Sequence, residues 1–339
     1  MTGGAGYIGA HVVRGLRQAG YGAVVLDDLS TGLADRVPEG VPLVTARVTD
    51  RRAVVLAMRR HAVEGVIHLA ARKSVTESMV RPAYYYRENV GGLASLLSVM
   101  ADAGVRRFVF SSSAAVYGAA SVAAVGESAA TVPVNPYGRS KLLGERLVRS
   151  AGMAGRLSWV ALRYFNVVGA AHSGLVDPSQ TNLVPLALRA AASGRAMTVM
   201  GADHPTRDGT AVRDYIHVED LADVHILVAA MLTDAGQSAT VFNAGTGSGH
   251  SVLDVLRCVK AATGQPVPYR VGARRAGDPS HVVARTDRIR RELGWWPRRT
   301  LADMITSMWP VWRPYRRPSP SAEPAELRST HDLPTARSP

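Results

Sequence analysis

Three glycines near the amino terminus constrain the fold more than any other feature of this sequence. Gly3, Gly6 and Gly9 form a G-x-x-G-x-x-G pattern, and an apolar helical periodicity begins at Ala10. Glycines at this spacing permit a tight turn and let a pyrophosphate approach the backbone N–H groups at a helix start. Glycine-rich turns are also common in ordinary loops, so the pattern needs a second signal.

The second signal is a carboxylate at the end of the next apolar run. Asp27 follows Val24 to Leu26, near the expected spacing of about 20 residues beyond the glycines. A carboxylate there accepts a hydrogen bond from an adenosine ribose 2′-hydroxyl and repels a 2′-phosphate. The two signals together predict a dinucleotide site that prefers NAD to NADP.

The order of apolar runs and amphipathic stretches predicts the fold class. Short apolar runs alternate with helical periodicity up to residue 166, which is typical of βαβ units. We predict an α/β fold with a doubly wound parallel Rossmann-type sheet in residues 1–166. Residues 167–312 are predicted to form mainly a smaller mixed α/β substrate domain, with some segments returning to the first domain. The Pro-, Ser- and Arg-rich residues 313–339 are predicted to be a disordered tail.

The first strand of this sheet is largely missing, because the glycine pattern starts at the third residue. A doubly wound sheet normally places that strand near its centre. We expect either an apolar β-branched run ahead of Met1 or a fold without this central strand. On the first expectation, a protein that starts at Met1 is poorly soluble or loses NAD easily.

Composition argues against several other function classes. No apolar run approaches the roughly 18 residues of a membrane span, so we expect no membrane association. The net charge is +13, but the basic pairs are dispersed and no aromatic-interleaved basic block occurs. We therefore expect solvated basic faces rather than nucleic-acid binding.

Cysteine and histidine usage points to a reducing compartment without a metal site. Cys258 is the only cysteine, so an internal disulfide is impossible and the cytoplasm is the expected location. The ten histidines are scattered rather than set at ligand spacing. We expect no structural metal.

Two motifs suggest acid–base chemistry. Tyr137 and Lys141 stand at i and i+4, on one face of a predicted helix. A phenol has a reference pKa of about 10, and a neighbouring ammonium favours its ionised form. Ser111 to Ser113 follows an apolar strand, where ligands of open α/β sheets collect. A hydroxyl there can bind a substrate oxygen beside the phenol.

Five strings together resemble the UDP-galactose (UDP-glucose) 4-epimerase family of extended short-chain dehydrogenases/reductases. They are Gly3 to Gly9 (GGAGYIG), Phe110 to Gly118 (FSSSAAVYG), Asn135 to Lys141 (NPYGRSK), Leu162 to Asn166 (LRYFN) and Asp208 to Val218 (DGTAVRDYIHV). The last string is the most particular to 4-epimerases. The resemblance implies NAD-dependent, reversible C4 epimerisation of UDP-glucose and UDP-galactose through a transient 4-keto sugar, in a cytoplasmic homodimer.

The resemblance also implies roles for individual residues. Tyr137 is the base, Lys141 lowers its pKa and binds a ribose, and Ser113 steadies the sugar O4. The implied cofactor-binding residues are Gly3, Gly6, Tyr7, Ile8, Gly9, Asp27, Asp28, Lys73, Asn89, Tyr137, Lys141 and Phe165. The implied substrate-binding residues are Ser113, Tyr137, Asn166, Asn182, Leu183, Arg213, Arg275, Asp278 and Val282.

Several positions bear on which reaction the chain supports. Ala46-Arg47 replaces a Gly-Asp pair whose Asp meets the adenine amino group in the family, so we expect looser NAD binding. Ala114 and Ala115 stand where 4,6-dehydratases and decarboxylases need carboxylates, which argues against those reactions. Val282 replaces a tyrosine that leaves no room for a 2-acetamido group. UDP-N-acetylhexosamines, UDP-glucuronate and a non-catalytic NAD-binding role remain open alternatives.

Overall fold

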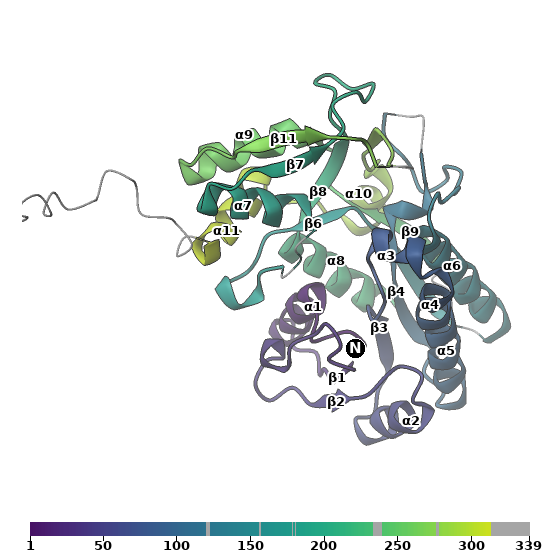
Figure 1. Ribbon diagram of the computed structural model, residues 1–339. Helices are drawn as coiled ribbons and strands as arrows, with labels where there is room; N and C mark the ends of the chain where they lie inside the picture. Colours follow the sequence, from purple (N-terminus) through teal and green to yellow (C-terminus); the bar gives the residue numbers. More distant parts are fainter. Residues whose placement is uncertain are drawn as a thin grey trace, which may run out of the picture.

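Helices and strands alternate along the first half of the chain and build a layered α/β structure (Figure 1). The computed structural model describes residues 1–312, apart from 120–122, 156, 178, 180, 233–238, 276 and 277. The tail predicted for residues 313–339 lies outside the described residues. Among the described residues, no helix is both long enough and apolar enough to cross a bilayer.

The main sheet is parallel throughout. Its strands run in the order β2-β1, then Thr2, then β3-β4-β5-β9. Their bounds are β1 (Val25–Asp27), β2 (Leu43–Thr45), β3 (Gly65–His68), β4 (Arg107–Ser113), β5 (Ser158–Tyr164) and β9 (Ala239–Ala244). The central strands β4 and β5 are almost wholly buried, as expected where helices cover both faces of a sheet.

Thr2 alone occupies the place of the first strand, so the predicted near-absence of that strand is confirmed. Thr2 forms parallel bridges to Leu26 and to His68. Its N–H donates to the Ile67 carbonyl at 3.0 Å, and its carbonyl accepts from Leu69 at 3.0 Å. Figure 1 shows the amino terminus between β1 and β3. Because Met1 and Gly3 hydrogen-bond with Leu26 on the other side, the two parts of the sheet are joined through the short segment Met1–Gly3.

Helices cover both faces of the main sheet. One face packs against α2 (Arg51–Arg60), α5 (Gly92–Asp102) and α6 (Pro136–Gly155). The other packs against α1 (Tyr7–Gln18) and α8 (Val218–Met231), with α10 (Asp287–Leu293) at its edge. In α1 the buried Val12, Val13 and Leu16 lie on one side of the helix. The predicted doubly wound Rossmann-type fold is confirmed.

Short helices precede α5 on the side of the main sheet that α6 covers. These are α3 (Val75–Val80) and α4 (Pro82–Tyr85), and a π-helical segment, Tyr86–Gly91, joins α4 to α5. The chain after residue 166 also returns to the main sheet. It supplies the strand β9, which pairs with β5, and the helix α8, which packs on one face of the sheet.

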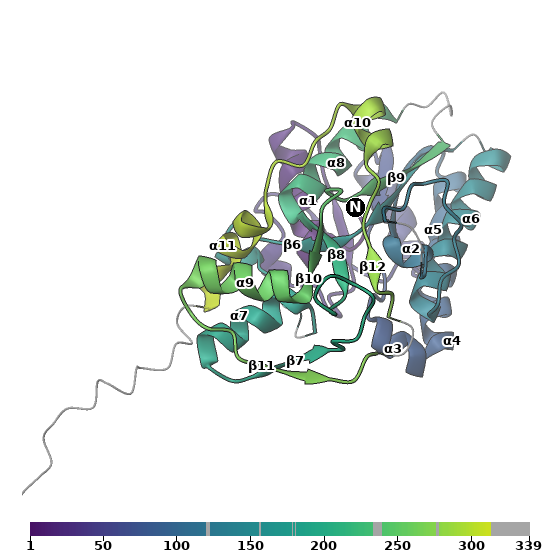
Figure 2. The ribbon, with the colours of Figure 1, turned by 90° about the horizontal axis from the view of Figure 1, so that it is seen from above.

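A second, smaller group of elements forms a mixed α/β layer (Figure 2). Its helices α7 (Leu183–Ser193), α9 (Val252–Thr263) and α11 (Leu301–Trp312) share one apolar cluster. Its strands are β6 (Asn166–Val168), β7 (Met197–Met200), β8 (Val212–His217), β10 (Gly249–Ser251), β11 (Tyr269–Gly272) and β12 (His281–Val282). Because β6 follows β5 after one residue and pairs with β8, it connects this layer to the main sheet.

A buried ion pair fixes α6 to the main sheet. Arg163 on β5 donates to both oxygens of Glu145 on α6, at 2.9 and 2.7 Å, and the side chains are 6% and 8% exposed. Ser112 on β4 donates to the same carboxylate. Burial alone would lower the pKa of Arg163, but the hydrogen bonds and charge of Glu145 raise it above its usual value. Arg163 therefore keeps its charge in the folded state.

Removal of the Glu145 carboxylate should be strongly destabilising. Glu145→Ala leaves the Arg163 guanidinium buried without its counter-charge, which we expect to lower the free energy of unfolding by about 3–5 kcal/mol. Urea unfolding followed by circular dichroism measures this. The matched control is Glu292→Ala, which removes the half-buried partner of Arg288 and should cost below about 1 kcal/mol. Equal losses in the two variants would contradict the role of the buried pair.

Candidate functional site

The glycine turn leads from Thr2 into α1 with no space for side chains. A Cβ at Gly9 would lie 2.1 Å from the Gly3 carbonyl oxygen, and a Cβ at Gly3 would lie 2.6 Å from the Ala70 nitrogen. Gly3 also has φ +73°, a conformation that favours glycine. The turn therefore brings bare backbone to the start of a 12-residue helix, which suits a pyrophosphate.

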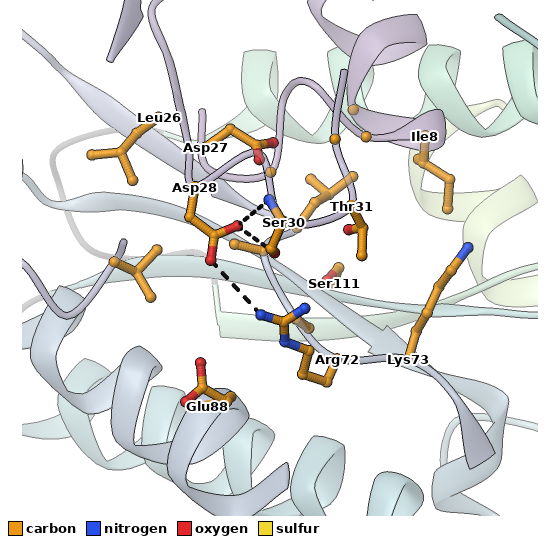
Figure 3. A pocket seen from close by; sticks show the side chains of 18 of the residues that line it. Ile8, Leu26, Asp27, Asp28, Ser30, Thr31, Arg72, Lys73, Glu88 and Ser111 are labelled. Atoms are coloured by element: carbon orange, nitrogen blue, oxygen red, sulfur yellow. Dashed lines mark hydrogen bonds and ion pairs between the residues drawn. The ribbon is translucent and has the colours of Figure 1, made fainter. Parts of the chain in front are cut away.

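Asp27 closes β1 beside this turn. Its carboxylate accepts from the backbone N–H groups of Ala5 and Leu29, each at 3.0 Å. Burial raises the pKa of Asp27. At Asp28, burial is outweighed by hydrogen bonds from Ser30 and the charge of Arg72, which lower its pKa. Figure 3 shows Asp28 contacting both Ser30 and Arg72.

A pocket extends from the glycine turn to α6. Ten of the predicted cofactor-binding residues line it, and they are Gly3, Gly6, Tyr7, Ile8, Gly9, Asp27, Asp28, Lys73, Tyr137 and Lys141. In Figure 3 the carboxylates of Asp27 and Asp28 lie on one side of this pocket and Lys73 on another. Both predicted features of a dinucleotide site, the glycine cradle and the strand-end carboxylates, thus meet in one cavity.

The predicted catalytic residues converge where β4 ends. Tyr137 lies in the first turn of α6, near Ser113, the last residue of β4. Lys141, one turn further along α6, donates to the Ser111 carbonyl at 2.7 Å and to the Ser111 hydroxyl at 3.3 Å. Lys141 is only 4% exposed. A phenol, a hydroxyl and an ammonium therefore gather beside the pocket.

The pKa shifts of Tyr137 and Lys141 agree only in part with the expectation from the sequence that Lys141 lowers the pKa of Tyr137. Burial raises the pKa of Tyr137, and the hydrogen bond with Ser113 opposes that rise. Burial lowers the pKa of Lys141 to about 7. The interaction that favours the Tyr137 phenolate in this structure comes from Ser113 rather than from Lys141. The role of Lys141 in lowering the pKa of Tyr137 stays a prediction.

Two predicted cofactor residues lie outside the pocket lining. Asn89 is buried and binds the backbone of Arg72 at 2.8 and 3.0 Å, so it supports the loop that carries Lys73. Phe165 packs in a small apolar cluster with Ala114 and Val282 instead. Its predicted contact with the cofactor stays a prediction.

The predicted substrate residues fall into two groups. Arg213 on β8 donates to Asp278 at 2.5 Å and to the Pro279 carbonyl at 2.6 Å, and Val282 on β12 pairs with Arg213 in the parallel ladder. These residues lie together although 65 positions separate Arg213 from Asp278. Arg275, just ahead of them, is exposed.

The second group lies at the ends of elements. Asn166 is exposed at the start of β6. Asn182 precedes α7 and donates to Asp177 at 2.7 Å, and Leu183 begins that helix and packs against its apolar cluster. None of the residues in these two groups lines the pocket, and their roles in substrate binding stay predictions.

Comparison with known proteins assigns the chain to a family. The model described as the NAD dependent epimerase/dehydratase family matches residues 1–245. The chain belongs to this family.

Individual members of the family are similar over most of the chain. A UDP-glucose 4-epimerase of Azospirillum brasilense is 45% identical over 309 residues, which cover 90% of this chain and 88% of that protein. A UDP-glucose 4-epimerase of Stenotrophomonas maltophila, solved with NAD and formylated UDP-arabinopyranose, has a TM-score of 0.88 and 41% identity. It covers 92% of this chain and 97% of its own. The corresponding enzyme of Brucella ovis, solved with NAD, has a TM-score of 0.87 and 40% identity over 92% of this chain and 97% of its own.

Sequence reasoning missed several residues that line the pocket. Arg72 and Glu88 face the adenosine side, where Arg47 donates to Glu88 at 2.6 and 2.8 Å. Tyr164 lines the pocket near Ser111. Two of these residues could have been found from the sequence. Tyr164 lies inside the string LRYFN that resembles the family, and Arg72 directly precedes the predicted cofactor-binding residue Lys73. Arg36, which also lines the pocket, carried no such signal.

The glycine cradle generates a prediction about cofactor retention. Gly9→Ala places a methyl group 2.1 Å from a carbonyl oxygen, so the turn must open and bound NAD should be lost. The control is Gly91→Ala in the helical segment before α5, where a Cβ meets nothing within 4 Å. That substitution should be neutral or add up to about 1 kcal/mol of stability. The NAD content of each purified variant is measured by absorbance after denaturation. Equal NAD contents in Gly9→Ala and Gly91→Ala would contradict this role of Gly9.

Proposed function

We propose that this chain catalyses the NAD-dependent, reversible C4 epimerisation of UDP-glucose and UDP-galactose. One observation carries the proposal. Tyr137, Ser113 and Lys141 converge at the end of β4, between a glycine cradle and the Arg213–Asp278 group on β8 and β12. That order of sites matches a nucleotide sugar whose C4 lies between a dinucleotide and a diphosphate anchor.

The pocket fits NAD. The glycine cradle admits a backbone-bound pyrophosphate, because a Cβ at Gly9 or Gly3 would fill it. Asp27 and Asp28 place carboxylates at the ribose end, where a 2′-phosphate would be repelled. NAD held by these residues would supply reversible hydride transfer at C4 of the sugar.

The protein supplies the proton chemistry. Tyr137 removes the proton of the sugar 4-hydroxyl and later returns it, while Ser113 hydrogen-bonds the same oxygen. Lys141 lies one turn away on the same helix face, and in its charged form it would favour the phenolate. Because Lys141 is held by Ser111 on β4, all three groups are fixed to one strand and one helix.

Substrate anchoring belongs to the C-terminal layer. Arg213 provides a cation at the diphosphate, and Asn182 and Leu183 provide the start of α7 near the uridine. A 4-keto sugar must turn over between the two hydride transfers, so the nucleotide end has to be bound more firmly than the sugar. Firm anchoring on β8 and α7 with few sugar contacts serves this requirement.

We also propose that the enzyme is a cytoplasmic homodimer. The single cysteine favours a reducing compartment. A dimer follows from the resemblance to the 4-epimerase family, and light scattering after size exclusion tests it.

Loss of the Tyr137 hydroxyl should abolish turnover. Tyr137→Phe removes the proton acceptor and should lower kcat by at least about 100-fold, whereas the affinity for UDP should change little. Conversion of UDP-galactose to UDP-glucose is followed by a coupled assay, and UDP affinity by calorimetry. A variant with near-normal kcat would overturn the assignment. If the unaltered protein converts none of UDP-galactose, UDP-glucuronate and UDP-N-acetylglucosamine, the non-catalytic alternative holds.

Val282 should widen the range of accepted sugars. Its side chain is 9% exposed and packs with Ala114 and Phe165, so a tyrosine at this position would take up much more space. We expect the natural protein to epimerise UDP-N-acetylglucosamine as well as UDP-glucose. Val282→Tyr should lose the first activity and keep the second.

The measurement compares kcat/KM of the two proteins on both substrates. A fall of about 10-fold or more for UDP-N-acetylglucosamine alone supports the role of Val282. If the natural protein does not convert this substrate, or if Val282→Tyr converts it equally well, Val282 does not set the specificity.

A further inference from the structure

One carboxylate in the cofactor pocket has no part in the chemistry described above. Glu88 belongs to the π-helical segment Tyr86–Gly91 and lines the pocket. Its side chain is only 12% exposed. Figure 3 shows the Glu88 carboxylate directed into the pocket, with Asp28 beyond it just after β1. A carboxylate is seldom enclosed in this way unless donors surround it.

The place of Glu88 along the pocket indicates which part of a dinucleotide it meets. The pocket lining follows the carboxyl ends of the parallel strands, from Ala46 after β2, past Asp27 on β1, to Ser111 on β4. The catalytic group stands at the β4 end, so the nicotinamide of NAD belongs there. The adenine is bonded to the ribose at Asp27 and therefore belongs at the β2 end. Arg47, the partner of Glu88, directly follows Ala46 at this end.

The hydrogen bonds that Glu88 accepts from other described residues leave one acceptor position open. Arg47 Nη2 donates to Oε1 at 2.8 Å and to Oε2 at 2.6 Å. Arg87 Nε donates to Oε1 at 3.1 Å. Each carboxylate oxygen offers about two lone pairs. Both lone pairs of Oε1 are thus in use, whereas Oε2 keeps one for a donor that enters the pocket.

The two arginines also keep this carboxylate ionised. Burial alone would raise the pKa of Glu88, but the hydrogen bonds and charges of Arg47 and Arg87 outweigh burial and lower it. An ionised carboxylate can only accept hydrogen bonds, and these bonds are stronger than those to a neutral oxygen. Glu88 therefore selects a hydrogen-bond donor.

The backbone that carries Glu88 is held in place by its neighbour Asn89. The Asn89 side chain accepts from the Arg72 N–H at 2.8 Å and donates to the Arg72 carbonyl at 3.0 Å. It also donates to the Ser140 hydroxyl on α6 at 2.9 Å. Because Asn89 is bound on both sides, Glu88 is held at the edge of the pocket and does not belong to a free loop.

Adenine offers a donor of the required kind at one position of its base edge. The exocyclic N6 amino group carries two hydrogens, whereas the unsubstituted ring nitrogens of the base only accept. Arg47 cannot accept from an amino group, which is why looser NAD binding was expected. The carboxylate that Arg47 holds supplies an acceptor at the same end of the pocket.

We propose that Glu88 recognises the adenine of the cofactor by accepting a hydrogen bond from its N6 amino group, and that Arg47 is the positioning residue that holds Glu88 there. The inference rests on the proposed function for the orientation of NAD, with the nicotinamide at the catalytic group. Glu88 is then a specificity-determining residue of the cofactor site, and Arg47 acts through it.

The test compares two nucleotides that differ only at this amino group. The probe is the NAD analogue with purine in place of adenine, in which a hydrogen atom replaces the N6 amino group. The purified protein is equilibrated with mixtures of NAD and the analogue, and the bound nucleotides are quantified by chromatography after denaturation. The natural protein should prefer NAD by about 10-fold or more, the worth of a hydrogen bond to a charged group.

Substitutions of Glu88 should reduce this preference. Glu88→Ala removes the acceptor, so the preference for NAD should fall below about 3-fold. Glu88→Gln keeps a neutral oxygen on a side chain of the same size and should give an intermediate preference. The matched control is Glu77→Ala, which removes a carboxylate that pairs with Arg81 at 3.2 Å and does not line the pocket. Its preference should equal that of the natural protein.

Arg47→Met tests the positioning role. It should reduce the preference for NAD less than Glu88→Ala does, and it should have no further effect in the Glu88→Ala background, because Arg47 acts through Glu88. The proposal is overturned if the natural protein shows no preference or if the preference survives Glu88→Ala. If Glu88→Ala retains neither nucleotide, Glu88→Gln decides, and an unchanged preference in that variant overturns the proposal as well.

This measurement requires no sugar substrate. A protein that shows the expected preference but converts no UDP-sugar would refute the proposed function and leave the role of Glu88 supported. Turnover of UDP-galactose by a protein that binds both nucleotides equally would do the reverse.

Discussion

The ion pair between Glu145 and Arg163 is the constraint on which the geometry of the site depends. Glu145 follows Lys141 by one helical turn, so both lie on the face of α6 that meets the sheet. Lys141 is bound by Ser111 and Glu145 by Ser112, at neighbouring positions of β4. A buried pair contributes little net stability once desolvation is counted. Together with Ser112, the pair ties α6 to β4 and β5, and so helps to place the first turn of α6, which carries Tyr137.

The first three residues, Met1 to Gly3, both lead into the glycine cradle and keep the main sheet continuous. Gly3 donates to the Leu26 carbonyl at 2.9 Å and also begins the cradle, directly after the Thr2 bridges. A ligand held by the cradle would therefore stabilise the only link between β1 and β3 described in the structure. Since binding to the folded state alone adds stability, cofactor occupancy and sheet integrity should be coupled in this protein.

Features carried by adjacent residues were predictable from the sequence, and features made by distant residues were not. The glycine spacing, Asp27 and the Tyr137–Lys141 pair each report local geometry, and the structure gathers them in one pocket. Tyr164 and His225 are 61 positions apart, and their contact depends on how α8 packs across β5. The raised pKa of Tyr137 was also missed, because burial is a property of the fold rather than of residue spacing. The near-absence of the first strand was predictable because the glycine pattern starts at the third residue, which leaves too few residues ahead of it to form a strand.

The charge distribution shows why net charge alone says little about the site. The chain carries a net charge of +13, yet on the adenosine side Arg47 is paired with Glu88 and Arg72 lies 3.8 Å from Asp28. The opposite charges within each pair largely cancel beyond a Debye length. The adenosine side of the pocket therefore has no strong cationic field from these arginines. Lys141, by contrast, is buried and donates to the carbonyl and the hydroxyl of Ser111. The polar contacts of Lys141 are thus made by neutral groups of β4 inside the protein, where salt in the solvent screens little.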